Sequence, residues 1–415
     1  MGEGTPEQIA LEVGKIFTPA VPVSESDLFA GRLSEIRRIV DAVNQRGQHA
    51  AIFGYRGVGK TSLANIISSK LTANVPVVAP HVNCDSLDTF TSLWKKVLSD
   101  IDLQQKRKLP GFQLEMFVET KNAADVLGDS VSPDDIRRLF TFLGEDKVLI
   151  VIFDEFDRMD SVARRAVADT IKTLSDHAVP VTVIIVGVAE TVDDLISEHE
   201  SIERALVQVE MPRMSRPELT EILTRGTKRL SMSITDEAAG FIATLSHGLP
   251  HYTHLLGLHA ARTALDLGKK KISADHVNAA ISQAVANSDA SLRSDFRKAI
   301  TSPQQGNIFR EVLLAAAMAP TDEFGYFPAA AVRAPLSMIR GRHCDIPSFA
   351  RHLKSFCQKS RGGVLEKSGT HFKLRYRFVN ALMPPLIVMK GLADQQITAA
   401  DVFEVKSGEG ERPVN

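Results

Sequence analysis

The spacing of apolar residues predicts alternating buried strands and amphipathic helices over the first half of the chain. Continuous apolar runs predict strands at 50–53, 76–83, 148–153 and 180–187. Helical periodicity predicts helices between them, at 62–71, 90–103 and 161–177. Strands that alternate with helices form a doubly wound parallel sheet, whose ligand binds at the carboxyl ends of the strands. The pattern therefore predicts an α/β domain with its site at that edge.

The second half of the chain is predominantly helical. Apolar spacing predicts helices at 217–223, 236–245, 252–267 and 274–281, the last with Ser273 as its N-terminal cap. Further helices are expected at 289–300, 307–318 and 348–359, the last after a turn at 345–347. Residues 362–378 have the pattern of a strand, a Ser-Gly turn and an alternating strand, which predicts a hairpin.

These patterns predict five parts, which agrees with two or three folded domains for 415 residues. They are an N-terminal arm (1–28), an α/β core (29–212), a helical region (213–288), a C-terminal domain with the hairpin (289–395) and a disordered tail (396–415). Within the core, residues 104–132 are expected to form an insertion or flexible excursion, because they are rich in Lys, Gly and Asp.

Composition is that of an ordinary soluble protein, with 44% hydrophobic and 24% charged residues. The three cysteines, Cys84, Cys344 and Cys357, are far apart, which predicts neither a disulfide framework nor a zinc site. The N-terminus lacks the pattern of a secretory signal, and no apolar run approaches the ~18 residues of a membrane span. We therefore expect a cytoplasmic protein without a membrane partner.

Charge is distributed unevenly along the chain. Residues 333–377 contain eleven Lys or Arg against two acids, in a chain whose net charge is −1. Such a contrast between regions favours an anionic partner for the C-terminal part, although a solvated basic surface gives the same count.

The most specific motif is Gly54-Tyr-Arg-Gly-Val-Gly-Lys-Thr61, which fits the phosphate-loop pattern G-x-x-x-x-G-K-[ST]. Its glycines allow positive φ, so that backbone N–H groups converge on phosphate oxygens, and the following helix directs its positive dipole end to the same anion. Lys60 is expected on the β/γ-phosphates and Thr61 on Mg²⁺. The predicted nucleotide-binding residues here are Gly54, Tyr55, Arg56, Gly57, Val58, Gly59, Lys60, Thr61 and Ser62.

A second motif ends the strand predicted at 148–153. Six apolar residues lead into Asp154 and Glu155, which is the Walker B pattern. A buried strand would deliver Asp154 to the Mg²⁺ shell and Glu155 to a water in line with the γ-phosphate. Together the two motifs predict an ATPase with ATP and Mg²⁺ as cofactors.

The segment Phe29-Ala-Gly-Arg32, the phosphate loop and the Walker B strand together resemble the AAA+ ATPases, and more narrowly the origin-recognition initiators and the ATPases that regulate transposition. The resemblance implies a P-loop core, a helical lid and a C-terminal winged helix. It implies that Arg32 lies beside the adenine. It also implies that Arg204, in Ser201-Ile-Glu-Arg204, is an arginine finger for a neighbouring subunit, with Arg213 as the rival.

Two positions depart from the family pattern. The strand tip Gly187-Val-Ala-Glu-Thr191 lacks the usual polar residue, so Glu190 or Thr191 would have to position the attacking water. The lid motif Gly248-Leu-Pro250 is shared with STAND signalling ATPases, and His251 follows it where initiators commonly have a basic residue. A histidine makes a weaker, pH-dependent phosphate contact than arginine.

The neighbouring His247, His254 and His259 invite a metal-site interpretation together with His251. Only His251 and His254 share a helix face, and no carboxylate has ligand spacing beside them, so polar positions on a lid helix explain them better.

The C-terminal helices and hairpin resemble a winged-helix domain, which implies a DNA partner. Its predicted DNA-binding residues are Arg351, Lys354, Lys359, Lys367, Lys373 and Arg375, with His371 tracking phosphates beside them. Intramolecular or protein contacts through the same domain are the alternative.

The sequence thus predicts an ATP-hydrolysing AAA+ protein that oligomerises with nucleotide and binds DNA. The alternative is a STAND-like nucleotide-gated switch that acts through a protein effector, and a metabolic kinase is a more distant third.

Overall fold

The computed structural model describes residues 6–22, 30–72, 77–108, 116–144, 148–196, 200–304, 306–322, 324–369 and 373–407. The chain forms two compact units. The core unit contains Pro22–Tyr55 and Lys60–Met211, and the helical unit contains Met1–Val21, Arg56–Gly59 and Pro212–Asn415. The five predicted domain boundaries stay predictions. Over the described ranges, no helix combines the length and the hydropathy of a membrane span.

The core unit is built on a parallel sheet in the order β2-β6-β7-β1-β8, with β3 also paired to β6. The strands are β1 (His49–Gly54), β2 (Val77–Val78), β3 (His81–Asn83), β6 (Val148–Asp154), β7 (Val181–Val188) and β8 (Leu206–Glu210). Crossovers between non-adjacent strands make the sheet doubly wound, which confirms the predicted α/β fold class.

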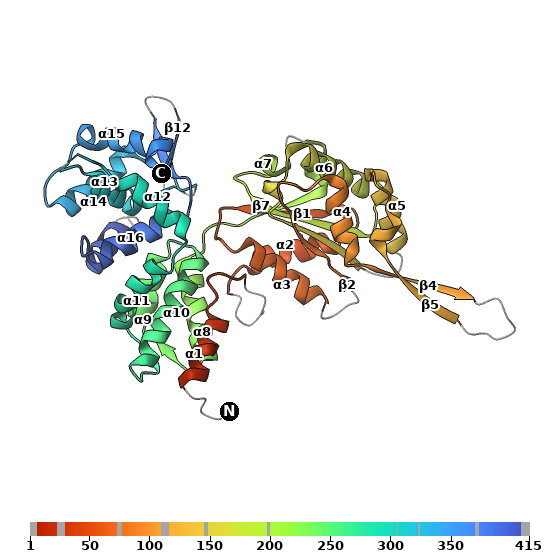
Figure 1. Ribbon diagram of the computed structural model, residues 1–415, viewed down its shortest axis with the longest axis horizontal. Coiled ribbons are helices and arrows are strands. Elements are labelled where there is room, and N and C mark those ends of the chain that lie inside the picture. Colours follow the sequence, from red (N-terminus) through yellow and green to blue (C-terminus); the bar gives the residue numbers. More distant parts are fainter. Residues whose placement is uncertain are drawn as a thin grey trace. The chain divides into compact units, whose positions relative to one another are not determined.

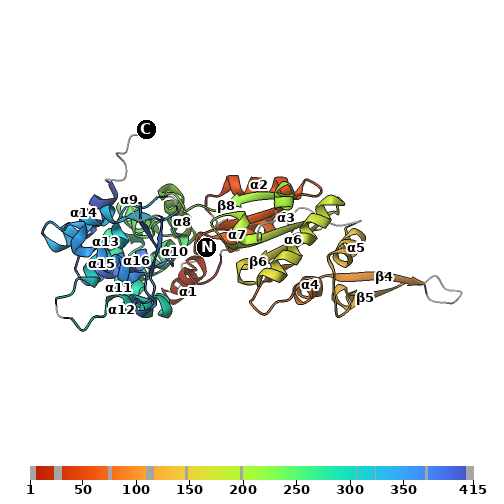
Figure 2. The same ribbon diagram turned by 90° about the horizontal axis from the view of Figure 1, so that it is seen from above.

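Helices cover both faces of this sheet (Figure 1, Figure 2). They are α2 (Leu33–Val43), α3 (Lys60–Thr72), α4 (Phe90–Ser99), α5 (Pro133–Leu143), α6 (Ser161–Asp176) and α7 (Val192–Ile196). On the face of α4, α5 and α6, the strand residues Val151, Phe153 and Ile185 join Trp94 and Phe140 in one buried cluster. Because both faces are buried, the strands read as continuous apolar runs rather than alternating ones.

Two elements of the core unit differ from the prediction. The strand expected at 76–83 is divided into β2 and β3 around Pro80, which has no N–H to donate to the ladder. The helix expected at 90–103 ends at Ser99, and an antiparallel hairpin follows, β4 (Asp102–Lys108) with β5 (Met116–Asn122). The segment 104–132, predicted as an insertion or flexible excursion, therefore contains regular structure and is not a flexible excursion throughout.

The lid part of the helical unit agrees closely with the predicted helices. It contains α8 (Arg216–Arg229), α9 (Asp236–Leu245), α10 (Pro250–Asp266), α11 (Ala274–Ala286) and a short parallel pair, β9 (Ser233–Ile234) and β10 (Lys271–Ile272). Ser273 is the N-cap of α11, as predicted, and its N–H donates to Nδ1 of His276 at 3.0 Å. The N-terminal helix α1 (Pro6–Ile16) packs on α10.

The C-terminal part has the elements of a winged helix. They are α12 (Ala290–Ile300), α13 (Phe309–Met318), α14 (Ala329–Arg340), α15 (Ile346–Phe356), α16 (Met383–Ala393), and an antiparallel sheet of β11 (Phe327–Pro328), β13 (Arg375–Phe378) and β12 (Leu365–Ser368). The predicted hairpin is confirmed as β12 and β13. Helix α14 was not predicted, because Pro335 in its interior opposes a helix assignment.

The tail predicted as disordered from residue 396 holds a further helix, α17 (Ala399–Ser407). Thr398 caps it by accepting the Asp401 N–H on its hydroxyl, and Val402 is buried. The ring of Phe403 packs against Phe241 of α9, 5.7 Å between centroids. Burial of apolar side chains and the N-terminal cap thus stabilise a helix in a segment whose composition predicted a disordered tail. Residues 408–415 lie outside the described residues.

His49 begins β1 and is fully buried in the sheet. Its Nδ1 accepts the N–H of Val183 at 3.0 Å, and burial lowers its pKa to about 4. A histidine whose pKa is lower in the folded than in the unfolded chain stabilises the fold above its unfolded pKa of 6.5, and this stability is lost as the pH falls.

We expect the free energy of unfolding of the core unit to fall by about 2 kcal/mol between pH 7.5 and pH 5 on account of His49 alone. His49→Asn, whose Oδ1 can accept the same N–H, should remove most of this decrease. Urea unfolding at both pH values measures it, with the exposed His177→Gln as the control. An equal decrease in His49→Asn and wild type would contradict the assignment.

Candidate functional site

The phosphate loop leaves β1 at Gly54, where the backbone has no room for a side chain. Gly54 has a φ of 143°, and a Cβ there would lie 2.5 Å from the Met211 carbonyl oxygen. Lys60, the first residue of α3, is buried and donates from Nζ to the carbonyls of Gly54 and Tyr55 at 2.9 and 2.7 Å. The lysine side chain therefore lies along the two residues that open the loop.

The tip of the loop, Arg56–Gly59, belongs to the helical unit. Gly57 and Gly59 have φ of 85° and 96°, the positive values that allow successive N–H groups to converge. A Cβ on Gly57 would lie 3.0 Å from Cδ2 of Leu382, which precedes α16, so the tip packs against the C-terminal part of this unit.

Asp154 ends β6 with a buried carboxylate. Burial opposes its ionisation, but the neighbouring side chains of His81 and Thr61 and the hydrogen bond from the Glu155 N–H outweigh burial and lower the pKa of Asp154. The His81 contact is long, 3.5 Å between Nε2 and Oδ2, whereas the Glu155 N–H lies 2.7 Å from Oδ1. Oδ2 is buried without a hydrogen-bond partner. An ionised carboxylate with a spare oxygen beside a threonine hydroxyl fits a hard cation such as Mg²⁺.

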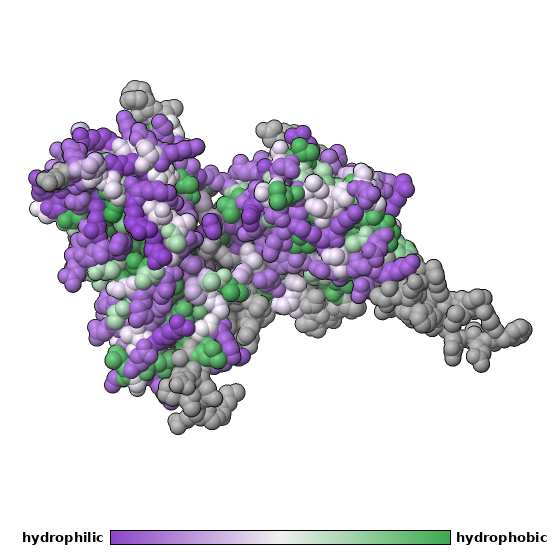
Figure 3. Space-filling model, in the orientation of Figure 1, coloured by the Kyte–Doolittle hydropathy of each residue, from purple (hydrophilic) through white to green (hydrophobic). Residues whose placement is uncertain are grey.

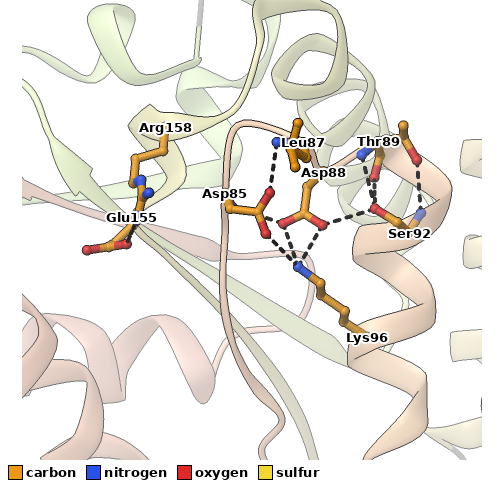
Figure 4. Close-up of polar contacts among 8 residues, drawn as sticks. All are labelled: Asp85, Leu87, Asp88, Thr89, Ser92, Lys96, Glu155 and Arg158. Carbon is orange, nitrogen blue, oxygen red and sulfur yellow. Dashed lines mark hydrogen bonds and ion pairs between the residues drawn. The ribbon is translucent and has the colours of Figure 1, made fainter.

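Glu155 follows in a left-handed conformation, with φ of 53°, that is uncommon for a residue with a side chain. Its carboxylate is half exposed and accepts Nη1 of Arg158 at 2.5 Å (Figure 4). Arg158 ends the 3₁₀ turn η2 (Phe156–Arg158), so the sequence places this cation three residues from the glutamate. The exposed carboxylate is in position to face a ligand beyond the strand ends.

A polar network lies beside this turn, after β3 (Figure 4). Lys96 of α4 donates to Asp85 at 3.2 Å and to the buried Asp88 at 2.8 Å. Hydrogen bonds from the Leu87 N–H and Lys96 lower the pKa of Asp85. This network fixes the loop that follows β3 at the same edge of the sheet.

The tip of β7 leaves the water-positioning residue undecided. Glu190 is exposed, and the Thr191 hydroxyl donates to Asp194 at 2.8 Å. Sequence reasoning missed Asp157, whose Oδ1 accepts the Val188 N–H at 2.7 Å and so ties η2 to the tip of β7. The sequence signal that could have identified Asp157 was an acidic residue two positions after Glu155.

The remaining core-unit candidates have clear positions. Arg32 is buried at the N-cap of α2, with φ of 62°, and donates from Nη1 to Glu35 at 3.1 Å. Phe29 of the same motif lies outside the described residues. Arg204 is exposed in the turn η3 (Glu200–Ala205), where Gln48 donates to its carbonyl at 3.2 Å.

Comparison with known proteins identifies the core. Residues 28–185 match the protein family described as the AAA ATPase domain. Over these residues the chain is therefore similar to AAA ATPase domains. No curated protein matches the chain.

Among solved structures, the chain is similar to a Walker-type ATPase of Pyrococcus abyssi, with TM-score 0.51 and 15% identity over 90% of this chain and 99% of that one. It is also similar to the ORC2 protein of Aeropyrum pernix in ADPNP–ADP complexes, with TM-score 0.50 and 14% identity over 96% and 98%. For Cdc6p of Pyrobaculum aerophilum the TM-score is 0.48, with 13% identity over 95% and 98%. At such identities the first two matches establish the fold, a P-loop NTPase with a helical lid and a winged helix.

His251, in the lid that follows the AAA ATPase domain, contacts the N-terminal segment. Its Nδ1 lies 2.8 Å from the carbonyl oxygen of Pro19, and burial lowers its pKa, an effect that this hydrogen bond opposes. Three residues on, Nδ1 of His254 accepts the Thr18 N–H at 3.3 Å. His251 thus keeps only Nε2 for another ligand.

Phe17 anchors the same segment between two lid helices. A Cβ on Gly226 of α8 or Gly257 of α10 would lie 2.6 or 2.9 Å from its ring. These contacts span more than 200 residues of sequence, so no local pattern pointed to them. Over the described part of the chain, no three His, Cys, Asp or Glu side chains group as a metal site.

Arg213, the rival arginine, donates from Nη1 to the His247 carbonyl at 2.7 Å. It is therefore held within the helical unit. Arg204 is exposed instead, which leaves it accessible to a neighbouring molecule.

The predicted DNA-binding side chains are exposed on the C-terminal part of the helical unit, where Figure 3 shows hydrophilic side chains over α14, α15 and β12. The exposed residues are Arg351, Lys354, Lys359, Lys367, Lys373 and Arg375. Arg375 is also paired to Asp322 at 2.8 Å. His371 lies outside the described residues. Arg342, between α14 and α15, is exposed too and was not singled out, because α14 itself was not predicted.

Proposed function

We propose that this protein hydrolyses ATP at the edge of the core sheet where β1 and β6 end. The observation that carries the proposal is the buried carboxylate of Asp154 at the end of β6, whose Oδ2 has no hydrogen-bond partner and whose pKa is lowered by neighbours that include Thr61, the residue after the phosphate-loop lysine. A carboxylate and a hydroxyl so arranged are the Mg²⁺ ligands of P-loop ATPases.

Each residue of the site then has a role. The backbone N–H groups of residues 54–62 hold the phosphates, and Lys60 turns from the loop carbonyls to the β/γ-phosphates. Thr61 and Asp154 would hold Mg²⁺, which would neutralise phosphate charge when bound. Glu155 orients the attacking water and accepts its proton. Arg158 holds the Glu155 carboxylate until water and nucleotide are in place.

Further residues complete the nucleotide site. Arg32 lies beside the adenine, and Nε2 of His251 makes a weak contact with the phosphates. Arg204 stabilises charge on the γ-phosphate of a neighbouring copy, so that the protein oligomerises when ATP is bound. The hydrogen bond of Arg213 to a backbone carbonyl favours Arg204 over Arg213 in this role.

Glu155→Gln should bind ATP as tightly as wild type and hydrolyse it at least 100-fold more slowly, because the amide cannot accept the proton of the water. Lys60→Ala should instead lose binding. Binding of a fluorescent ATP analogue and phosphate release measure the two effects, with Glu237→Gln, an exposed glutamate of α9, as the matched control. Wild-type hydrolysis by Glu155→Gln would refute the role of Glu155.

We also propose that the C-terminal part binds duplex DNA. Arg351 and Lys354 lie three residues apart and exposed on α15, the second helix of a helix-turn-helix, which is the element that enters the major groove in such domains. The remaining basic side chains of β12, β13 and the turn after α15 would contact phosphates.

The double variant Arg351→Ala/Lys354→Ala should bind duplex DNA about tenfold more weakly at 100 mM salt. The slope of log K against log salt should decrease by about 2, because two fewer counterions are released. Fluorescence anisotropy across a salt series measures both. The control is Lys269→Ala/Lys270→Ala, which removes the same charge from two exposed lysines of the lid. Equal weakening by both double variants would exclude a specific basic surface.

A nucleotide-gated switch that acts through a protein effector is the second candidate, favoured by the contact between Leu382 and the loop tip. The Leu382 carbonyl accepts the hydroxyl of Tyr252, a fully buried residue of α10, at 2.6 Å. This bond holds the C-terminal part against Gly57 and would slow nucleotide exchange.

Under the switch hypothesis, Tyr252→Phe should release ADP about fivefold faster, since one hydrogen bond contributes about 1 kcal/mol. Stopped-flow displacement of a fluorescent ADP measures the rate. Thr263→Val on the same helix, which loses a local hydroxyl, is the control. An unchanged release rate in Tyr252→Phe would argue against the switch.

A further inference from the structure

We propose that a cavity between α11, α12 and α16 binds a small amphiphilic anion, with an apolar chain or ring and a carboxylate or phosphate headgroup. The cavity has a volume of about 300 Å³. This is at the lower end of the range of about 300–1,000 Å³ that small-molecule sites occupy. It lies within the helical unit and shares no residue with the nucleotide site.

The floor of the cavity is apolar. Phe296 of α12 and Leu386 of α16 line it and are 4% and 1% exposed, and Val285 and Ala290 continue the lining. Water in contact with such a floor finds few hydrogen-bond partners, so a ligand with an apolar body gains by displacing it.

The rim of the cavity is cationic. Arg293 and Arg297 lie one helical turn apart on α12, and Lys390 follows Leu386 by one turn on α16. Among the described residues that line the cavity, none is acidic. The rim therefore attracts an anion, and a neutral ligand would leave it uncompensated.

The existing partners of these cations leave room for an anion. Arg293 donates to the carbonyl of Ala286, at the end of α11. Lys390 lies 3.3 Å from Asp394, but Arg310 shares this carboxylate. For Arg297, the described part of the chain offers no ion-pair partner. Arg297 and Lys390 are thus the groups that would bind the headgroup, above the apolar floor.

A bound ligand would bridge the last lid helix, α11, to α12 and α16 of the C-terminal part. Because α12 connects these two parts of the chain, the site is placed to stabilise one arrangement of the helical unit.

Calorimetric titration of the full chain with sodium octanoate tests the proposal, alongside octyl phosphate, 1-octanol and sodium acetate. We expect saturable 1:1 binding of octanoate or octyl phosphate, whichever headgroup suits the rim, and at least tenfold weaker binding of octanol and acetate. Arg297→Gln/Lys390→Gln should weaken binding of the amphiphilic anion about tenfold, through the loss of two partly exposed charge contacts.

The control is Lys298→Gln, an exposed lysine of α12 that pairs with Asp295 and does not line the cavity; it should bind like wild type. Ala290→Phe, at an exposed helix start, should fill the cavity and block binding independently of charge. Far-UV circular dichroism verifies that each variant is folded. The proposal is overturned if neither amphiphilic anion binds, if octanol binds as tightly, or if the double variant retains wild-type affinity.

Discussion

The candidate nucleotide site depends on one buried carboxylate kept ionised. Asp154 stands at the end of a strand that is buried on both faces, where desolvation alone would favour the neutral acid. The hydrogen bond from the Glu155 N–H and the neighbouring side chains of His81 and Thr61 reverse that preference and lower the pKa of Asp154. The contacts of Asp154 come from Thr61 after the phosphate loop, from Glu155 at the start of η2 and from His81 of β3.

Close backbone contacts and positive φ values then restrict which residue types can occupy the carboxyl ends of the strands. Gly54 passes the Met211 carbonyl too closely for any side chain. Gly187 is likewise closed in by Leu195 and Asp157, so that β7 ends against the turn that carries Glu155. Glu155 itself adopts positive φ, a conformation that costs about 1 kcal/mol or more and persists because the surrounding bonds hold it. Strain at this residue agrees with a functional role for it.

Sequence alone predicted the features that follow from local rules. The placement of the phosphate loop after β1 and of Asp154 at the end of β6 was predictable because a parallel sheet brings its carboxyl ends together, and the Ser273 cap was predictable because caps are local. The β4–β5 hairpin was not, since a two-stranded ribbon apart from the main sheet lacks the alternation of a half-buried strand. The contact of His251 with Pro19 could not be predicted, because it joins residues 232 apart. Helix α17 had a sequence signal in the Thr398–Asp401 cap, but the composition of the segment favoured a disordered tail.

The function has the same division between features that local residues determine and features that depend on distant partners. Local geometry supports nucleotide and Mg²⁺ binding, whereas Arg204 is exposed and acquires a role only in an assembly. The most direct test is therefore the mass of the protein in solution, measured by light scattering with ADP and with a non-hydrolysable ATP analogue, each with and without duplex DNA. We expect a larger assembly with the analogue than with ADP, increased further by DNA. The same mass in all four conditions would contradict it.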